Sequence, residues 1–151
     1  MVDSIEQLSF SLAIGELAEQ ERALAMLRSC AGTVLAAASV AGSFLVSAIR
    51  HGPAGALGIL AIASFALCSG SAIWVLLPHT FVFAFRGQTL LRASDQSRSA
   101  SMSDAYRAAG AWIEPLVRRN RAKIRALAEC LTLSCALLAL EVILWTVTAL
   151  V

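Results

Sequence analysis

One acidic residue stands inside a long apolar stretch near the end of the chain. Glu141 is the single charged residue between positions 130 and 151. An ionisable side chain in such a stretch destabilises the helix by several kcal/mol unless it is neutralised or paired, so it usually faces a partner, water or a pore. Two interpretations stay open. Glu141 lines a polar path, or it is protonated and hydrogen-bonded to a neighbouring group, so that it stabilises the packing of the helices.

The densest group of basic residues precedes that apolar stretch. Such a group binds anionic lipid headgroups or a nucleotide phosphate, although its most common role is to anchor the adjacent membrane span in its orientation. Nucleic-acid binding is not expected, because no base-stacking or groove-reading element accompanies it. The cytoplasmic basic cluster consists of Arg118, Arg119, Arg121, Lys123 and Arg125.

Other chemistry finds little support in the sequence. The four cysteines form no CxxC pair and only two histidines are present, so we expect no metal site and no cofactor. The chain contains no GxSxG, HExxH, GxGxxG or P-loop motif. We therefore expect a protein that is not an enzyme.

Three long apolar segments must position these residues, at 29–49, 54–77 and 130–151. About 20 apolar residues, rising ~1.5 Å each, cross the ~30 Å hydrocarbon layer of a bilayer. The chain is 58% apolar and 15% charged, whereas soluble domains carry about 25% charged residues. The sequence predicts an all-α integral membrane protein, one domain over residues 1–151 with three transmembrane helices.

The basic residues are distributed unequally between the connecting segments. Of the twelve, eleven lie in segments 1–28 and 78–129, and one, Arg50, lies in the hairpin at 50–53. Because Lys and Arg favour the cytoplasmic side, the N-terminus and the long loop are predicted to be cytoplasmic, with the C-terminus outside the plasma membrane.

The cytoplasmic segments are predicted to be helical extensions of spans one and three. Residues 5–28 form an amphipathic helix that continues into span one, with Gln20 among its polar residues. A second helix is expected to begin at Ser103 as its N-cap, to kink or break at Pro115 and to continue into span three. Residues 80–85 are β-prone and 94–103 read as a loop. The predicted apolar face of the first helix contains Phe10, Ile14, Leu17, Leu24 and Leu27.

Small residues spaced along span one permit close helix packing. Gly32, Ala36 and Gly42 are examples, since small side chains let helix backbones approach each other in lipid. They serve packing within one chain, or they form the face on which several copies assemble into a homo-oligomer.

Several short motifs occur in a characteristic order. Glu21-Arg22-Ala23 stands just before span one, Leu76 to Pro78 closes span two, FVFAFRG follows, and an N-x-x-K-I step at 120–124 leads into span three. This order resembles the Pycsar effector transmembrane family and the related SLATT-type small bacterial membrane proteins.

The resemblance implies a membrane effector or pore-forming homo-oligomer in a bacterial nucleotide-signal defence system against phage. It implies a nucleotide ligand or a partner protein on the cytoplasmic helices, and a place in the bacterial inner membrane. The alternative is a structural or accessory subunit that packs against a larger membrane complex.

Overall fold

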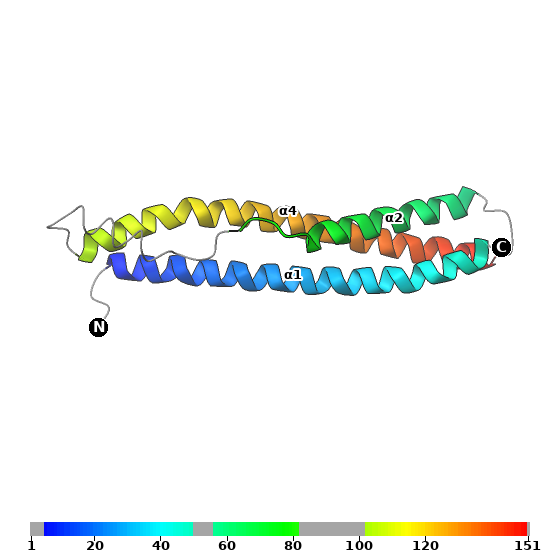
Figure 1. The fold of residues 1–151 in the computed structure, drawn as a ribbon, viewed down its shortest axis with the longest axis horizontal. Coiled ribbons are helices and arrows are strands. Elements are labelled where there is room, and N and C mark those ends of the chain that lie inside the picture. The colour runs from blue at the N-terminus through cyan, green and yellow to red at the C-terminus, as the bar shows by residue number, and fades with distance from the viewer. Residues whose placement is uncertain (1–4, 50–55, 82–101, 151) are drawn as a thin grey trace. The chain divides into compact units, whose positions relative to one another are not determined.

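The computed structural model describes residues 5–49, 56–81 and 102–150, and its regular structure in these residues is entirely helical. Its helices are α1 (Ile5–Ile49), α2 (Ala56–Leu76) and α4 (Met102–Leu150), as Figure 1 shows. All three are long and apolar enough to cross a membrane. The all-helical part of the prediction is thus confirmed, and the three helices are compatible with a membrane protein. The predicted hairpin at 50–53, most of the β-prone segment 80–85 and most of the loop at 94–103 lie outside the described residues.

The first helical extension and span one form a single helix, as predicted. α1 contains 45 residues and no proline, so its backbone hydrogen bonds continue from the charged part of the helix into the apolar part. No residue in it requires an unusual backbone conformation, since no described residue has a positive φ.

The second extension and span three also form one helix, α4, with 49 residues. Of the kink or break predicted at Pro115, the break is wrong, because α4 continues through this residue, while the kink stays a prediction. Proline removes one amide donor and leaves the carbonyl of Ala111 without its helical partner. Both Ala111 and Pro115 are exposed, so water can bond that carbonyl. α4 begins at Met102, and Ser103 therefore lies inside its first turn instead of preceding it.

The described chain divides into two compact units by its internal contacts. Unit 1 consists of residues 1–24 and 79–124, and unit 2 of residues 25–78 and 125–151. α1 and α4 each contribute one part to both units.

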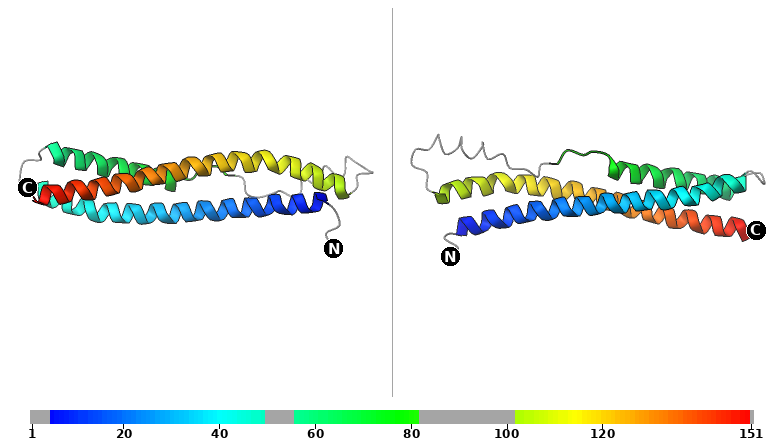
Figure 2. Two further views of the ribbon diagram at one scale, coloured as in Figure 1. Left: turned by 180° about the vertical axis from the view of Figure 1, so that it is seen from behind. Right: turned by 60° about the horizontal axis from the view of Figure 1, so that its bottom comes forward.

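In unit 1, α1 and α4 lie side by side and run in the same direction (Figures 1 and 2). Phe10 contacts Tyr106, with ring centroids 5.5 Å apart, and Leu17 packs against Ile113 and Val117 further along both helices. Later residues of α1 thus meet later residues of α4, which makes the pair parallel. The buried residues of α1 in unit 1 recur every three or four positions, the spacing of a coiled-coil seam.

The seam in unit 1 includes an amide that the sequence pattern placed on the polar face. Gln20 is only 8% exposed, and its Nε2 donates to the carbonyl of Val117 at 3.0 Å. Ile14, expected on the apolar face, is 38% exposed, and Ala13 takes the packing position beside it. Phe10, Leu17 and Leu24 thus lie on the contact face as predicted, whereas Ile14 does not. A buried polar side chain in a parallel helix pair fixes register.

In unit 2, α2 runs antiparallel to α4. Ser71 contacts Ser134, whereas the earlier residue Ala61 packs with the later residue Leu144. Most of the large apolar side chains of unit 2 point outward. Examples with at least half of their surface exposed are Val40, Phe44, Ile59, Leu67, Trp74, Leu133 and Ile143. Such a surface suits lipid better than water.

Candidate functional site

Polar groups line the contact between α2 and α4. The hydroxyl oxygens of Ser71 and Ser134 lie 2.6 Å apart. The Cys68 thiol donates to the carbonyl of Ser134 at 3.3 Å, and the Cys130 thiol to the carbonyl of Ser71 at 3.6 Å. We call the polar residues of this contact the polar seam: Ser64, Cys68 and Ser71 on α2, with Cys130, Ser134 and Glu141 on α4.

The serine hydroxyls of the polar seam are fully used. The oxygen of Ser71 lies 2.8 and 2.9 Å from the carbonyls of Leu67 and Cys68, and that of Ser134 lies 3.0 Å from the carbonyl of Cys130. Each hydroxyl has one hydrogen, so one serine donates to the other while the second donates to a carbonyl of its own helix. This end of the polar seam has its hydrogen bonds satisfied.

Glu141 differs from the rest of the polar seam. Its side chain is 0% exposed, and neither carboxyl oxygen has a hydrogen-bond partner among the described residues. The pairs Ser71–Ser134 and Ala61–Leu144 fix an antiparallel register in which the buried Ser64 lies opposite Glu141. Because buried polar groups almost always find partners, an unpartnered buried acid calls for a functional explanation.

A second unpartnered polar group lies one helical turn from Glu141. The indole Nε1 of Trp145 is buried and has no acceptor among the described residues. Its ring packs against the cluster of Ala61 and Leu144. Positions 141 and 145 lie on the same face of a helix. The carboxyl group of Glu141, at the end of the polar seam, and the indole N–H of Trp145, one turn beyond it, are thus both without a partner in the described residues.

The structure places the predicted packing residues of span one in different surroundings. A Cβ atom on Gly42 would stand 2.8 Å from the ring of Phe65 on α2, so Gly42 makes a close contact within one chain. A Cβ atom on Gly32 would meet nothing within 4 Å, and Ala36 is exposed. The role of the three residues in self-association stays a prediction, and Gly32 and Ala36 are free to serve it.

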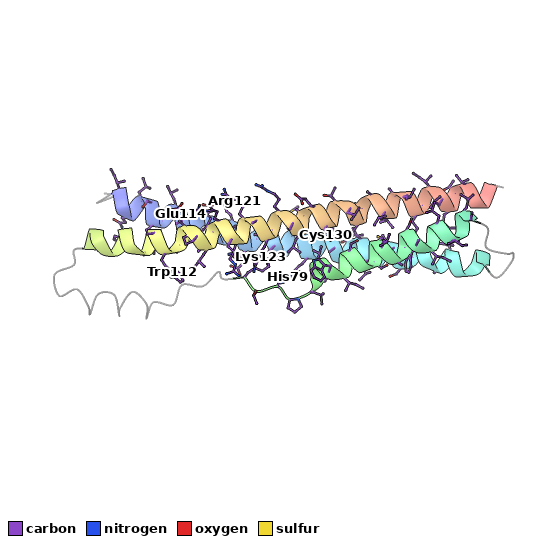
Figure 3. The ribbon with its side chains drawn as sticks, turned by 90° about the horizontal axis from the view of Figure 1, so that it is seen from above. His79, Trp112, Glu114, Arg121, Lys123 and Cys130 are labelled. Atoms are coloured by element: carbon purple, nitrogen blue, oxygen red, sulfur yellow. The ribbon has the colours of Figure 1, made fainter. Side chains whose placement is uncertain are left out.

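Three members of the basic cluster have partners within unit 1. Arg121 forms an ion pair with Glu16 of α1, and Arg118 bonds Glu114 at 3.2 Å on its own helix. Lys123 donates to the carbonyl of Thr80 at 2.6 Å and lies 5.5 Å from the ring centroid of Phe81. Figure 3 shows Lys123 on α4 beside the chain that follows α2.

Arg119 and Arg125, the other members of the cluster, are exposed. Among the residues described, neither forms an ion pair, since the ion pairs there join Arg118 to Glu114 and Arg121 to Glu16. Within the same residues, no three His, Cys, Asp or Glu side chains come together in a group that could hold a metal ion.

The sequence contained a signal for the burial of Glu141 that its apolar surroundings obscured. Positions 113, 120, 127, 134 and 141 are seven residues apart, and all five are at most 5% exposed. A seven-residue recurrence marks one continuous contact face of a helix. Counting forward from Asn120 and Leu127 by the same seven-residue step leads to Ser134 and Glu141.

Comparison of the chain with protein-family models, with curated proteins and with solved structures returned no match.

Proposed function

We propose that this chain is a multi-pass effector of the bacterial inner membrane, with its N-terminus in the cytoplasm and its C-terminus outside. In this proposal several copies assemble into a homo-oligomer that opens a polar path through the bilayer. The observation that carries the proposal is the fully buried, unpartnered carboxyl group of Glu141 inside an apolar helix.

An acid at this position is hard to reconcile with a role in packing alone. Replacing a buried charged or ionisable group by an apolar residue of similar size is often neutral or stabilising. A subunit that only packs would therefore be served as well by leucine at position 141. Acids within membrane spans are typically associated with paths for ions or protons.

The polar seam supplies a route by which such a path could form. In the single chain Glu141 is enclosed, so a path that uses it requires α2 to separate from α4. Among the described residues, three hydrogen bonds oppose this separation: the Ser71–Ser134 contact and two thiol bonds. Hydrogen bonds between membrane helices contribute only ~0.6 kcal/mol on average. Separation would expose all the polar groups of the seam at once.

The trigger is proposed to act on the cytoplasmic helices. The ion pair of Glu16 and Arg121 joins α1 to α4 and is largely exposed, with 35% and 64% of the side chains accessible. A nucleotide phosphate would compete with the Glu16 carboxylate for Arg121, because guanidinium groups bind both anions in the same manner. This step follows the resemblance to effectors of nucleotide-signal antiphage defence.

A disulfide lock between α2 and α4 tests the opening. The hydroxyl oxygens of Ser71 and Ser134 are close enough that cysteines at both positions should form a disulfide, whose sulfurs are ~2.05 Å apart. The double variant Ser71→Cys/Ser134→Cys is made in a background with Cys30, Cys68, Cys130 and Cys135 replaced by alanine. Ion flux from proteoliposomes should be absent in the oxidised protein and return on reduction. The background chain, which has no cysteine, should give the same ion flux with and without the reductant.

Two results would contradict the proposal. Equal flux before and after reduction of a fully formed disulfide would exclude separation of α2 from α4. Absence of flux from the wild-type chain, together with unchanged membrane potential when it is expressed in cells, would exclude the effector role itself.

An accessory subunit is the second candidate. The observation that favours it is the exposure of apolar residues near the start of α1, where Ile5, Leu8 and Leu12 are 84%, 47% and 65% exposed. A larger membrane complex could cover them. Expression in cells separates the two functions, because an accessory subunit should leave the membrane potential unchanged and co-purify with its complex.

A further inference from the structure

The carboxyl group of Glu141 lies in surroundings that offer it very few ligands. In α2, the described residues 56–76 contain one titratable side chain, Cys68. The thiol of Cys68 donates to the carbonyl of Ser134. In α1, the described residues of unit 2 contain two titratable side chains, Arg28 and Cys30, which stand at the start of span one. No basic side chain in the described part of the spans accompanies the acid.

A metal cation would find too few oxygen ligands at this position. Membrane sites for sodium use carbonyl oxygens freed where a helix is unwound. α1, α2 and α4 are each continuous over the described residues, so their carbonyls are committed to helical hydrogen bonds. The hydroxyls of Ser71 and Ser134 are occupied with each other and with backbone carbonyls. A proton needs only one carboxyl oxygen.

We propose that Glu141 is a proton-binding site within the membrane, and that Trp145 Nε1 donates to its carboxylate when the proton leaves. With the proton bound, the neutral acid has a hydroxyl that can donate across the helix contact to Ser64, which the register places opposite. With the proton released, the anion needs a donor. The buried, unpartnered indole N–H one turn further along α4 is suited to this role.

Release of the proton from Glu141 conserves atoms and charge. The O–H bond of the carboxylic acid breaks, the proton passes to water that enters the polar seam, and the electron pair stays on the carboxylate. No oxidant, metal or other reactant takes part. The site does not depend on the proposed effector role, because proton binding can be measured on the purified chain whether or not it forms a conducting path.

Labelling with a lipid-soluble carbodiimide tests proton binding. This reagent reacts with a protonated carboxyl group in apolar surroundings and leaves a stable adduct that mass spectrometry locates. The full-length chain in lipid nanodiscs should gain one adduct per chain at Glu141 near neutral pH. Glu141→Gln should gain none there, and Glu129→Gln, which changes an exposed acid on the same helix, should label as the wild type does.

The dependence of labelling on pH and on cations distinguishes a proton site from a metal-cation site. Labelling should fall reversibly at alkaline pH and should be unaffected by sodium or potassium at constant ionic strength. Protection by either cation would overturn the proposal in favour of a metal-cation site. Labelling that persists at every pH at which the helices remain intact would show a permanently neutral acid, and absence of labelling in the folded chain would show that no proton is held. Either result overturns the proposal.

Fluorescence tests the part played by Trp145. In the variant Trp74→Phe/Trp112→Phe, Trp145 is the only tryptophan, and its emission should change reversibly between acidic and alkaline pH. Adding Glu141→Gln should abolish the change, whereas adding Glu129→Gln should preserve it. If the emission change survives Glu141→Gln, Trp145 does not respond to this carboxyl group and its assigned role is wrong.

Discussion

The side-chain hydroxyls of Ser71 and Ser134 meet at 2.6 Å and join α2 to α4 by the one side chain–side chain hydrogen bond found between these helices in the described residues. Its neighbours in the contact are thiol bonds to backbone carbonyls, which are weaker. Among the described residues, this pair is therefore the strongest hydrogen bond between α2 and α4.

A double-mutant cycle should measure that coupling. Ser71→Ala, Ser134→Ala and the double variant should show a coupling free energy of about 0.6 kcal/mol, the average for hydrogen bonds between membrane helices. Thr132→Ala is the matched control, because its hydroxyl bonds only the carbonyl of Ala128 on its own helix, at 2.9 Å. Unfolding in mixed micelles gives the free energies. Strictly additive effects of the two serine changes would show that the contact contributes nothing.

Gly42 should be sensitive to added volume because of Phe65. Gly42→Ala places a methyl group 2.8 Å from the end of the half-buried Phe65 side chain, so the ring has to shift, and the cost should lie at the lower end of the ~1–3 kcal/mol typical of overpacking. The loss should appear as a lower free energy of unfolding of the monomer in detergent, because the contact lies within one chain and does not involve a second copy. Gly32→Ala is the control and should be harmless, since an added Cβ there meets nothing within 4 Å.

A smaller side chain at position 65 should rescue the Gly42 variant. Gly42→Ala/Phe65→Leu removes the ring and should recover part of the lost stability relative to Phe65→Leu alone. If instead Gly42→Ala leaves monomer stability unchanged and abolishes crosslinked oligomers, Gly42 belongs to an interface between copies.

The charge distribution predicts the topology. A reporter that is active only outside the cytoplasm should give signal when fused at Gly52 and after Val151, and none when fused at Ser97. The reason is the unequal distribution of basic residues, eleven in the segments predicted to be cytoplasmic and one in the hairpin. A signal at Ser97 would reverse the proposed orientation.

The helices followed from the sequence more completely than their contacts did. The apolar runs and the lack of proline before Ser29 were enough to predict one helix through the first extension and span one. Pro115 misled the prediction, because its exposed position lets α4 continue at the loss of one hydrogen bond. The prediction for Gln20 was also wrong. Its amide was assigned to the polar face of the helix, whereas in the structure it is buried and donates to the carbonyl of Val117.

The polar seam could not be predicted because it depends on the pairing of two helices. Serine and cysteine are common in membrane helices, where they can bond a carbonyl of their own helix, as Thr132 and Thr146 do. Nothing in the sequence of α2 alone distinguishes Ser71 from such residues. The antiparallel register with α4 gives it a partner. Glu141 was recognised from its chemistry, whereas its enclosure within a single chain was not.

The buried residues that recur every seven positions from Ile113 to Glu141 lie along one face of the continuous helix α4. Each residue adds ~100° of rotation, so one alanine inserted after the exposed Ala126 would turn Glu141 by roughly 100° relative to Ile113 and Asn120. The contacts of α2 with α4 in the described residues all lie after the insertion, at positions 130–144, so Glu141 would stay opposite Ser64. The insertion would instead turn the contact face of α4 after Ala126 away from the face formed by Ile113 and Asn120. Seven inserted residues would restore the angle between these two faces while lengthening the helix between them by one heptad, so comparing insertions of one and seven separates the effect of their angle from that of their distance.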